Sequence, residues 1–158
     1  MNCMILCVGR LKEDWQKDGC HEYLKRLTRY GAYELVEVPD QKEPTKRSDA
    51  LERQVMDKEG EELMRRIKPT DHVVALCING KVLDSVQLST RLDELSMSGK
   101  RTVFVIGGSL GLSDDVISRA DERLSFSNFT FPHPLMRVIL LEQLYRAARI
   151  SANERYHK

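Results

Sequence analysis

The stretch that decides the fold runs Ser127-Asn-Phe-Thr-Phe-Pro-His-Pro-Leu-Met-Arg-Val-Ile-Leu-Leu-Glu-Gln-Leu-Tyr-Arg-Ala-Ala-Arg149. Two prolines bracket His133, and a run of helix formers follows at once. Pro134 suits the first turn of a helix, where a backbone N–H would lack an intrahelical partner. The spacing predicts a helix over 135–150 whose apolar residues cover more than one stripe. We therefore expect this helix to be buried on two sides, against its own sheet and against something else.

The expected C-terminal helix carries few polar side chains. A charged group on a mostly buried helix usually has a partner or a ligand. Residue types alone leave two alternatives open, a core helix with snorkelling arginines and a functional site. The proline-bounded loop before the helix favours a site, because irregular loops on a rigid scaffold tend to carry function. The polar residues are Arg137, Glu142, Gln143, Tyr145, Arg146 and Arg149.

Upstream of this stretch, short apolar runs alternate with amphipathic segments. The apolar runs predict strands at 3–8, 33–38, 72–78, 102–106 and 124–127. Helices are expected at 11–27 and 48–67, and also after Asp84 and after Ser113. This alternation predicts one α/β domain spanning residues 1–158, with a mostly parallel sheet flanked by helices.

Several local signals refine this outline. In the first helix, the expected inner face carries Trp15, Tyr23, Leu24 and Leu27. Ser48 is expected to cap the second helix, and Asp84 with Gln87 three residues later forms a capping box. Asn79-Gly80 is expected to end the third strand and to turn the chain toward this capped helix.

Charge and cysteine content exclude several classes of protein. The net charge is +1, so no global field points to nucleic acid or membrane. Residues 133–158 nevertheless hold five Arg or Lys against two Glu, which fits either phosphate contact or an ordinary solvated tail. The four cysteines form no C-x-x-C pair and predict reduced thiols in a cytoplasmic protein without a metal. The first residues lack signal-peptide features, and no run is long enough to span a membrane.

Gly107-Gly-Ser-Leu-Gly111 matches the G-x-S-x-G pattern of hydrolase nucleophile elbows. Ser109 would then be the nucleophile, with Asp121 and His133 as its partners. The next helix begins too late for this geometry, and no second glycine-rich segment offers an oxyanion hole. The same glycines suit a nucleoside-containing cofactor that approaches the backbone closely, or a plain tight turn. His133 is a lone histidine, and a lone histidine is more often structural than catalytic.

Three segments together carry a resemblance to a known family. They are Ile106-Gly-Gly-Ser-Leu-Gly-Leu-Ser113, Leu124-Ser-Phe-Ser-Asn-Phe-Thr-Phe-Pro-His-Pro-Leu-Met-Arg-Val138 and Glu142-Gln-Leu-Tyr-Arg-Ala147. From end to end, the chain resembles the ribosomal RNA large subunit methyltransferase H family, which belongs to the SPOUT class. The resemblance implies a deep trefoil knot, a homodimer and S-adenosylmethionine as the cofactor. It also implies methylation of N3 of a pseudouridine in 23S ribosomal RNA, which we expect to take place on assembled ribosomes.

The resemblance also implies which residues form the site. By position, the implied cofactor contacts are Leu76, Cys77, Gly108, Ser127, Asn128, Phe129, Thr130, Phe131 and Pro132. His133 is the candidate base or orienting group, because N3 must lose a proton. Arginines could bind phosphate or developing charge, a carboxylate could hold an arginine, and tail aromatics could orient the base. These further candidates are Arg137, Glu142, Tyr145, Arg146, Arg149, Tyr156 and His157.

Overall fold

The computed structural model describes residues 1–156, and in this range five strands form one parallel sheet. The strands are β1 (Asn2–Val8), β2 (Ala32–Val38), β3 (His72–Val82), β4 (Thr102–Ile106) and β5 (Glu122–Ser125). Their order across the sheet is β2-β1-β4-β3-β5, and every neighbouring pair is parallel. The predicted α/β class with a parallel sheet is confirmed.

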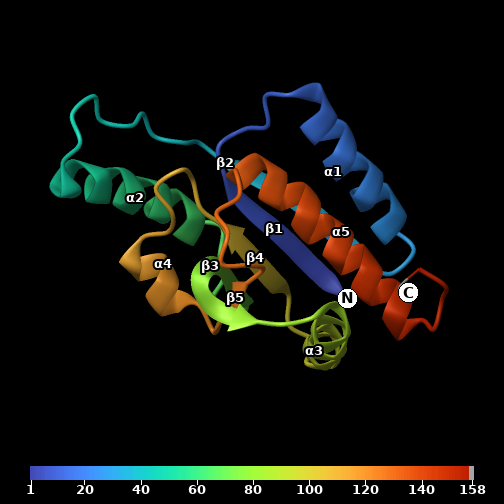
Figure 1. Cartoon of the computed structure of the whole chain (residues 1–158). Helices are drawn as coiled ribbons and strands as arrows, with labels where there is room; N and C mark the ends of the chain where they lie inside the picture. Colours follow the sequence, from blue (N-terminus) through green and yellow to red (C-terminus); the bar gives the residue numbers. More distant parts are fainter. Residues whose placement is uncertain (157–158) are drawn as a thin grey trace.

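Helices cover both faces of the sheet (Figure 1). They are α1 (Asp14–Leu27), α2 (Asp49–Met64), α3 (Ser85–Met97), α4 (Asp114–Arg119) and α5 (His133–Ser151). Along β1, Cys3, Ile5 and Cys7 pack into the core under α1, α3 and α5. The alternate residues Met4, Leu6 and Val8 pack into the core under α2 and α4. Burial on both faces explains why β1 is apolar without alternation.

The C-terminal helix α5 is buried on more than one side, as expected. Its residues Leu140, Leu141 and Leu144 are completely covered. Besides the sheet, α5 packs against α1 and α3 of the same chain. Close approach to α1 depends on Gly19, where a Cβ would stand 3.2 Å from Val138 Cγ1. Neighbouring helices of the same chain therefore supply much of the second surface that the apolar pattern demands.

Two of the local predictions about helix starts need correction, and one is confirmed. The capping box is present, since Asp84 Oδ1 accepts from Gln87 N at 2.7 Å and Asp84 N donates to Gln87 Oε1 at 3.0 Å. Ser48 occupies the N-cap position of α2, but its side chain makes no capping hydrogen bond. The first helix begins at Asp14 and not at residue 11, because the N–H of Leu11 is held by Glu37 Oε1 at 2.9 Å.

Trp15 does not lie on the inner face of α1 and is 55% exposed. The buried residues of this helix are Cys20 and Leu27, with Tyr23 and Leu24 partly buried beside them. At about 100° per residue, Trp15 lies roughly 140° around the helix from Cys20. The prediction was wrong because apolar character was given more weight than helical phase.

The third strand differs from the prediction in a way that shapes the site. It continues through Asn79-Gly80 to Val82 instead of ending near Ile78. Leu124 of β5 pairs with both Leu76 and Lys81, so the intervening residues of β3 arch away from the ladder. At Gly80, a Cβ would stand 2.5 Å from the carbonyl carbon of Leu124, so the two backbones touch. β5 correspondingly lies two residues earlier than expected.

Two further findings concern helix length and the cysteines. Among residues 1–156, no helix is both long and apolar enough to cross a membrane. The four cysteines are free thiols, and three of them, Cys3, Cys7 and Cys20, are buried. Burial raises the pKa of each of these three thiols, as expected for core cysteines.

Candidate functional site

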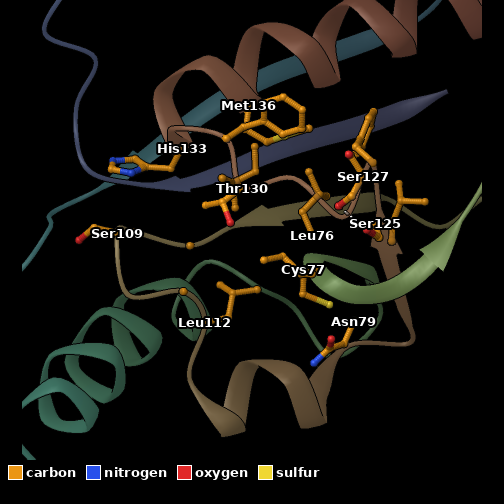
Figure 2. A pocket seen from close by; sticks show the side chains of 18 of the residues that line it. Leu76, Cys77, Asn79, Ser109, Leu112, Ser125, Ser127, Thr130, His133 and Met136 are labelled. Atoms are coloured by element: carbon orange, nitrogen blue, oxygen red, sulfur yellow. Dashed lines mark hydrogen bonds between the residues drawn. The ribbon is translucent and has the colours of Figure 1, made fainter. Parts of the chain in front are cut away.

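A cleft of about 720 Å³ opens where β3, β4 and β5 leave the regular sheet (Figure 2). Three segments form its walls: the arch of β3 from Leu76, the glycine turn after β4, and the chain from β5 into α5. Ligands of open α/β sheets bind outside the carboxyl ends of the strands, which is where this cleft lies. Its size is typical of small-molecule sites.

The glycine turn forms one wall almost entirely from backbone. Gly111 N donates to Gly108 O at 3.0 Å, and Gly111 has a positive φ of 94°. A Cβ at Gly107 would stand 2.6 Å from the carbonyl group of Gly111. Only glycine allows the chain to fold back so tightly, and the result is a wall that a ligand can approach closely.

The segment between β5 and α5 forms the opposite wall. Ser125 Oγ donates to Ser127 O at 3.2 Å, and Ser127 Oγ accepts from Phe129 N at 3.0 Å. These bonds shape a loop that has no regular secondary structure until His133. Phe129 is 78% exposed, so a large apolar side chain stands uncovered at the rim.

The structure brings together most of the predicted cofactor contacts. Asn128 is exposed and does not line the cleft. The others line it: Leu76, Cys77, Gly108, Ser127, Phe129, Thr130, Phe131 and Pro132. The lining includes the apolar residues Leu76, Leu112 and Leu124 and the glycines of the turn after β4. Apolar residues beside a tightly folded glycine turn suit a nucleoside, so the residues present fit S-adenosylmethionine.

His133 is the first residue of α5 and stands at the mouth of the cleft (Figure 2). Burial and the nearby Arg137 guanidinium lower its pKa from the ordinary value, against the opposing effect of Asp40 and Glu43. The imidazole is therefore neutral at pH 7. A neutral imidazole at the edge of a ligand cleft can accept a proton.

The residues of the hydrolase alternative are not assembled. Ser109 Oγ donates to Glu43, and Asp121 accepts from Val73 N at 2.8 Å near the start of β3. Asp121 therefore lies at the amino edge of the sheet, whereas Ser109 and His133 lie at the carboxyl edge. In addition, α4 begins only at Asp114, so Ser109 is not presented by a helix start. This geometry contradicts the hydrolase reading.

Arg137 lies in the core and not on a surface that RNA could reach. Its side chain has 0% exposure. Its guanidinium bonds Glu37 Oε1 at 2.7 Å, Val8 O at 2.6 Å and Gly9 O at 2.9 Å. These contacts tie α5 to the carboxyl ends of β1 and β2. In this subunit Arg137 is a structural clamp, and the expectation that it meets phosphate needs correction.

The other polar candidates gather along the C-terminal half of α5 and on the tail that follows it. Glu142 Oε1 accepts from Arg146 Nη2 at 2.6 Å and from Tyr156 OH at 3.1 Å. Arg149 Nη1 donates to Tyr145 OH at 2.9 Å, and the rings of Tyr145 and Tyr156 have centroids 5.0 Å apart. We call these five residues the tail cluster.

The tail cluster is ordered by the C-terminal segment folding back on α5. Arg146 stacks on the Tyr156 ring, 4.7 Å from its centroid. Burial and hydrogen bonds with Tyr23 and Glu142 raise the pKa of Tyr156 to about 12. With 19 residues, α5 is about 28 Å long. Within one subunit, its two ends hold His133 and the tail cluster apart. His157 lies outside the described residues.

Two acids, the half-buried Glu37 and the buried Glu59, were not singled out by sequence reasoning. Glu37 supports both Arg137 and the backbone of Leu11. Glu59 is 4% exposed and lies behind Gly108. The sequence carries a signal beside Glu59, because a glycine inside a helix, here Gly60 of α2, indicates that another segment packs closely against it. In the structure this segment contains Ser113, whose Oγ lies where a Cβ of residue 60 would be. In residues 1–156, no group of three or more His, Cys, Asp or Glu side chains is arranged to hold a metal ion.

Comparisons with known proteins agree with this architecture. The family described as "Predicted SPOUT methyltransferase" matches residues 1–157. The chain is 50% identical to ribosomal RNA large subunit methyltransferase H of Alkaliphilus oremlandii and 52% identical to that of Listeria welshimeri, with all of each chain covered. A crystal structure of a methylase family protein from Neisseria gonorrhoeae shares the fold, with a TM-score of 0.54 and 12% identity. That likeness covers 91% of this chain and 81% of the other.

Proposed function

The chain belongs to the ribosomal RNA large subunit methyltransferase H family of SPOUT methyltransferases, and we propose on that basis that it methylates large-subunit ribosomal RNA. The observation that carries the proposal is the cleft, whose walls are glycine backbone and a proline-bounded loop at the carboxyl edge of the sheet. This is the kind of cavity that a nucleoside cofactor needs.

The proposed cofactor is S-adenosylmethionine, which supplies an electrophilic methyl group on a sulfonium. The arch of β3, with Leu76 and Cys77, and the turn at Gly108 would hold the adenosine between apolar groups and backbone. The loop from Ser127 to Pro132 would close the opposite side. These residues would bind and orient the cofactor and exclude water from it.

The proposed acceptor is N3 of a pseudouridine, which must lose its proton as the new bond forms. His133 is the candidate base, because it is neutral and stands at the mouth of the cleft. It would take the N3 proton on its imidazole. Arg146 and Arg149 of the tail cluster remain candidates for contact with RNA phosphates, and Tyr156 for contact with the base.

A homodimer would explain how two separated groups serve one reaction. His133 and the tail cluster stand at opposite ends of α5 in one subunit. In a two-fold dimer, the tail cluster of one subunit can meet the cleft of the other. The exposed apolar side chain of Phe129 at the rim of the cleft would then be covered.

We also infer that the chain is knotted. The double pairing of Leu124 with Leu76 and Lys81 supports this, because the chain around Gly80 arches across β5 before the C-terminal segment begins. Threading of Ser127–Pro132 through that arch would bring the loop and the glycine turn to one cavity. Deep knots are rare exceptions to ordinary chain topology.

The net charge of +1 suggests that binding to naked RNA is weak. We therefore propose that the enzyme recognises assembled ribosomes through surface shape, with both subunits contributing. The test compares transfer of labelled methyl groups to free 23S ribosomal RNA and to ribosomes lacking the modification, with mass spectrometry locating the methyl group. Transfer to ribosomes only is expected. Equal efficiency on free RNA and on ribosomes would contradict the proposed recognition of assembled ribosomes. Absence of transfer to either substrate would contradict the proposed methyltransferase activity.

Two measurements separate the methyltransferase from its alternatives, a serine hydrolase that uses Ser109 and a ribosome-binding module without catalysis. Ser109→Ala is expected to leave methyl transfer largely intact, since Ser109 Oγ is engaged with Glu43. Calorimetric titration with S-adenosylmethionine provides an independent measurement. A ribosome-binding module without catalysis would take up no cofactor.

A further inference from the structure

Glu59 of α2 is a buried carboxylate that lacks a full set of partners. Its side chain is covered except for 4% of its surface. Glu59 Oε1 accepts from the backbone N–H of Gln41 at 2.9 Å, but Oε2 has no hydrogen-bond partner within residues 1–156. Buried polar atoms are nearly always paired, so an unpaired carboxylate oxygen needs a physical explanation.

The unpaired oxygen is turned toward the cleft. It would stand 2.9 Å from a Cβ placed on Gly108, and Gly108 itself lines the cavity. Between the carboxylate and the cleft there is thus one residue without a side chain. With one glycine between them, a charge on Glu59 acts on whatever occupies the cavity.

The surroundings of Glu59 contain no compensating cation among the groups that shift its titration. Burial raises the pKa of Glu59, and the nearby Asp40 and Glu43 raise it further, whereas the Gln41 N–H lowers it. The buried Asp71 provides a contrast, because Arg101 Nη2 lies 2.6 Å from its Oδ2. An unpaired buried acid beside two other acids destabilises the folded chain, and a cation close by would relieve this.

We propose that Glu59, reinforced by Asp40 and Glu43, makes the cleft select a cationic ligand, so that it binds the sulfonium cofactor in preference to the spent thioether product. The inference rests on the proposed function. In methyl transfer the S–CH₃ bond breaks and its electron pair stays on sulfur, which becomes neutral, while N3 forms the new bond and gives up its proton. The positive charge at sulfur therefore disappears during turnover. Glu59 is a positioning residue that acts across Gly108 and touches no reacting atom.

The test measures dissociation constants of S-adenosylmethionine and S-adenosylhomocysteine by calorimetry, using the full chain and its Glu59→Gln variant. The substitution keeps the shape and the Gln41 contact but removes the charge. The preference for S-adenosylmethionine over S-adenosylhomocysteine is expected to fall about fivefold or more. Glu61→Gln is the matched control, because Glu61 lies two residues along α2 and is exposed. Its preference should equal that of the unaltered chain.

Further outcomes separate failure of this inference from failure of the proposed function. An unchanged preference in Glu59→Gln would overturn the inference while leaving the methyltransferase intact. Absence of binding of both compounds to the unaltered chain would instead contradict the proposed function. The double variant Asp40→Asn/Glu43→Gln alters exposed residues only. It should weaken the preference in the same direction, and if Glu59→Gln fails to fold, an unchanged preference in the double variant overturns the inference.

Discussion

Arg137 shows how one buried residue can hold the whole site in place. Its guanidinium joins α5 to Glu37 on β2 and to the carbonyl groups of Val8 and Gly9 at the end of β1. Four residues earlier on the same helix, His133 lines one edge of the cleft (Figure 2). The position of the candidate base therefore depends on an ion pair that has no direct part in the chemistry.

Replacing Arg137 by Met should destabilise the protein strongly. The substitution leaves the carbonyl groups of Val8 and Gly9 without their donor and Glu37 without its cation, and removing one partner of such a largely buried pair costs about 3 kcal/mol. Urea unfolding monitored by circular dichroism measures the loss. Arg26→Met is the control, since Arg26 pairs with Glu22 on an exposed face and should change little. Similar stability of the two variants would show that the clamp is not needed.

His133 leads to a prediction about pH. Only the neutral imidazole can accept a proton, and the pKa of His133 lies below its ordinary value of 6.5. Methyl transfer should therefore be constant near pH 7 and fall as the pH drops below about 6.5, through the lowered pKa. The measurement is kcat against pH under saturating substrates. His133→Asn should reduce kcat about a hundredfold or more and abolish this acid limb. An identical acid limb in the variant would assign it to another group.

Among the elements, the arch of β3 beside β5 shapes one wall of the cleft. β3 pairs with β5 before and after the arch, and the arch carries Cys77 and Asn79 into the cavity wall. The arch needs a residue without a side chain at Gly80, because this residue lies against the backbone of Leu124 and Ser125. Backbone atoms on both sides leave no flexible group that could move away.

Gly80→Ala should therefore lower the free energy of unfolding by about 2 kcal/mol or more, as expected for overpacking. Its Cβ would stand 2.7 Å from the backbone nitrogen atoms of Leu124 and Ser125. Lys81→Ala is the control, since the exposed Lys81 side chain is next in sequence and removal of its outer part creates no clash. Chemical denaturation of both variants measures the difference. Equal denaturation midpoints of the two variants would show that the arch can accommodate a Cβ at position 80.

At the scale of the whole molecule, the candidate groups fall into two regions. The cleft with His133 lies at one end of α5, and the tail cluster around Tyr145 and Tyr156 lies at the other. A single subunit cannot bring them together without unpacking α5 from α1 and α3. If both regions act in one reaction, a second subunit must supply one of them.

Complementation between subunits tests this arrangement. His133→Ala and Arg149→Ala should each be nearly inactive alone. When both are coexpressed, each mixed dimer contains one site built from two intact halves and one site with both halves altered, so purified mixed dimers should show about half of the unaltered activity. Methyl transfer by separately tagged and doubly purified dimers measures the recovery. No recovery, despite confirmed mixed dimers, would place both groups in one subunit's site.

The sequence by itself determined the order and type of the elements, because burial on both faces of a parallel sheet produces continuous apolar runs such as Cys3–Val8. It also indicated the glycine turn and the proline-bounded loop as walls of a site, since both depend on backbone restrictions that single residues impose. The capping box at Asp84 and Gln87 was predictable for the same reason, as its contacts span only three residues.

Only the tertiary structure decided which polar residues are structural and which face the cleft. Arg137 and Glu37 are 100 residues apart in sequence. Glu59, which belongs to helix α2, lies behind Gly108 in the turn after β4. The double pairing of Leu124 likewise joins distant segments. Local patterns report the periodicity and backbone preference of a segment, but the partner of a charged group depends on which segments the packed sheet brings together.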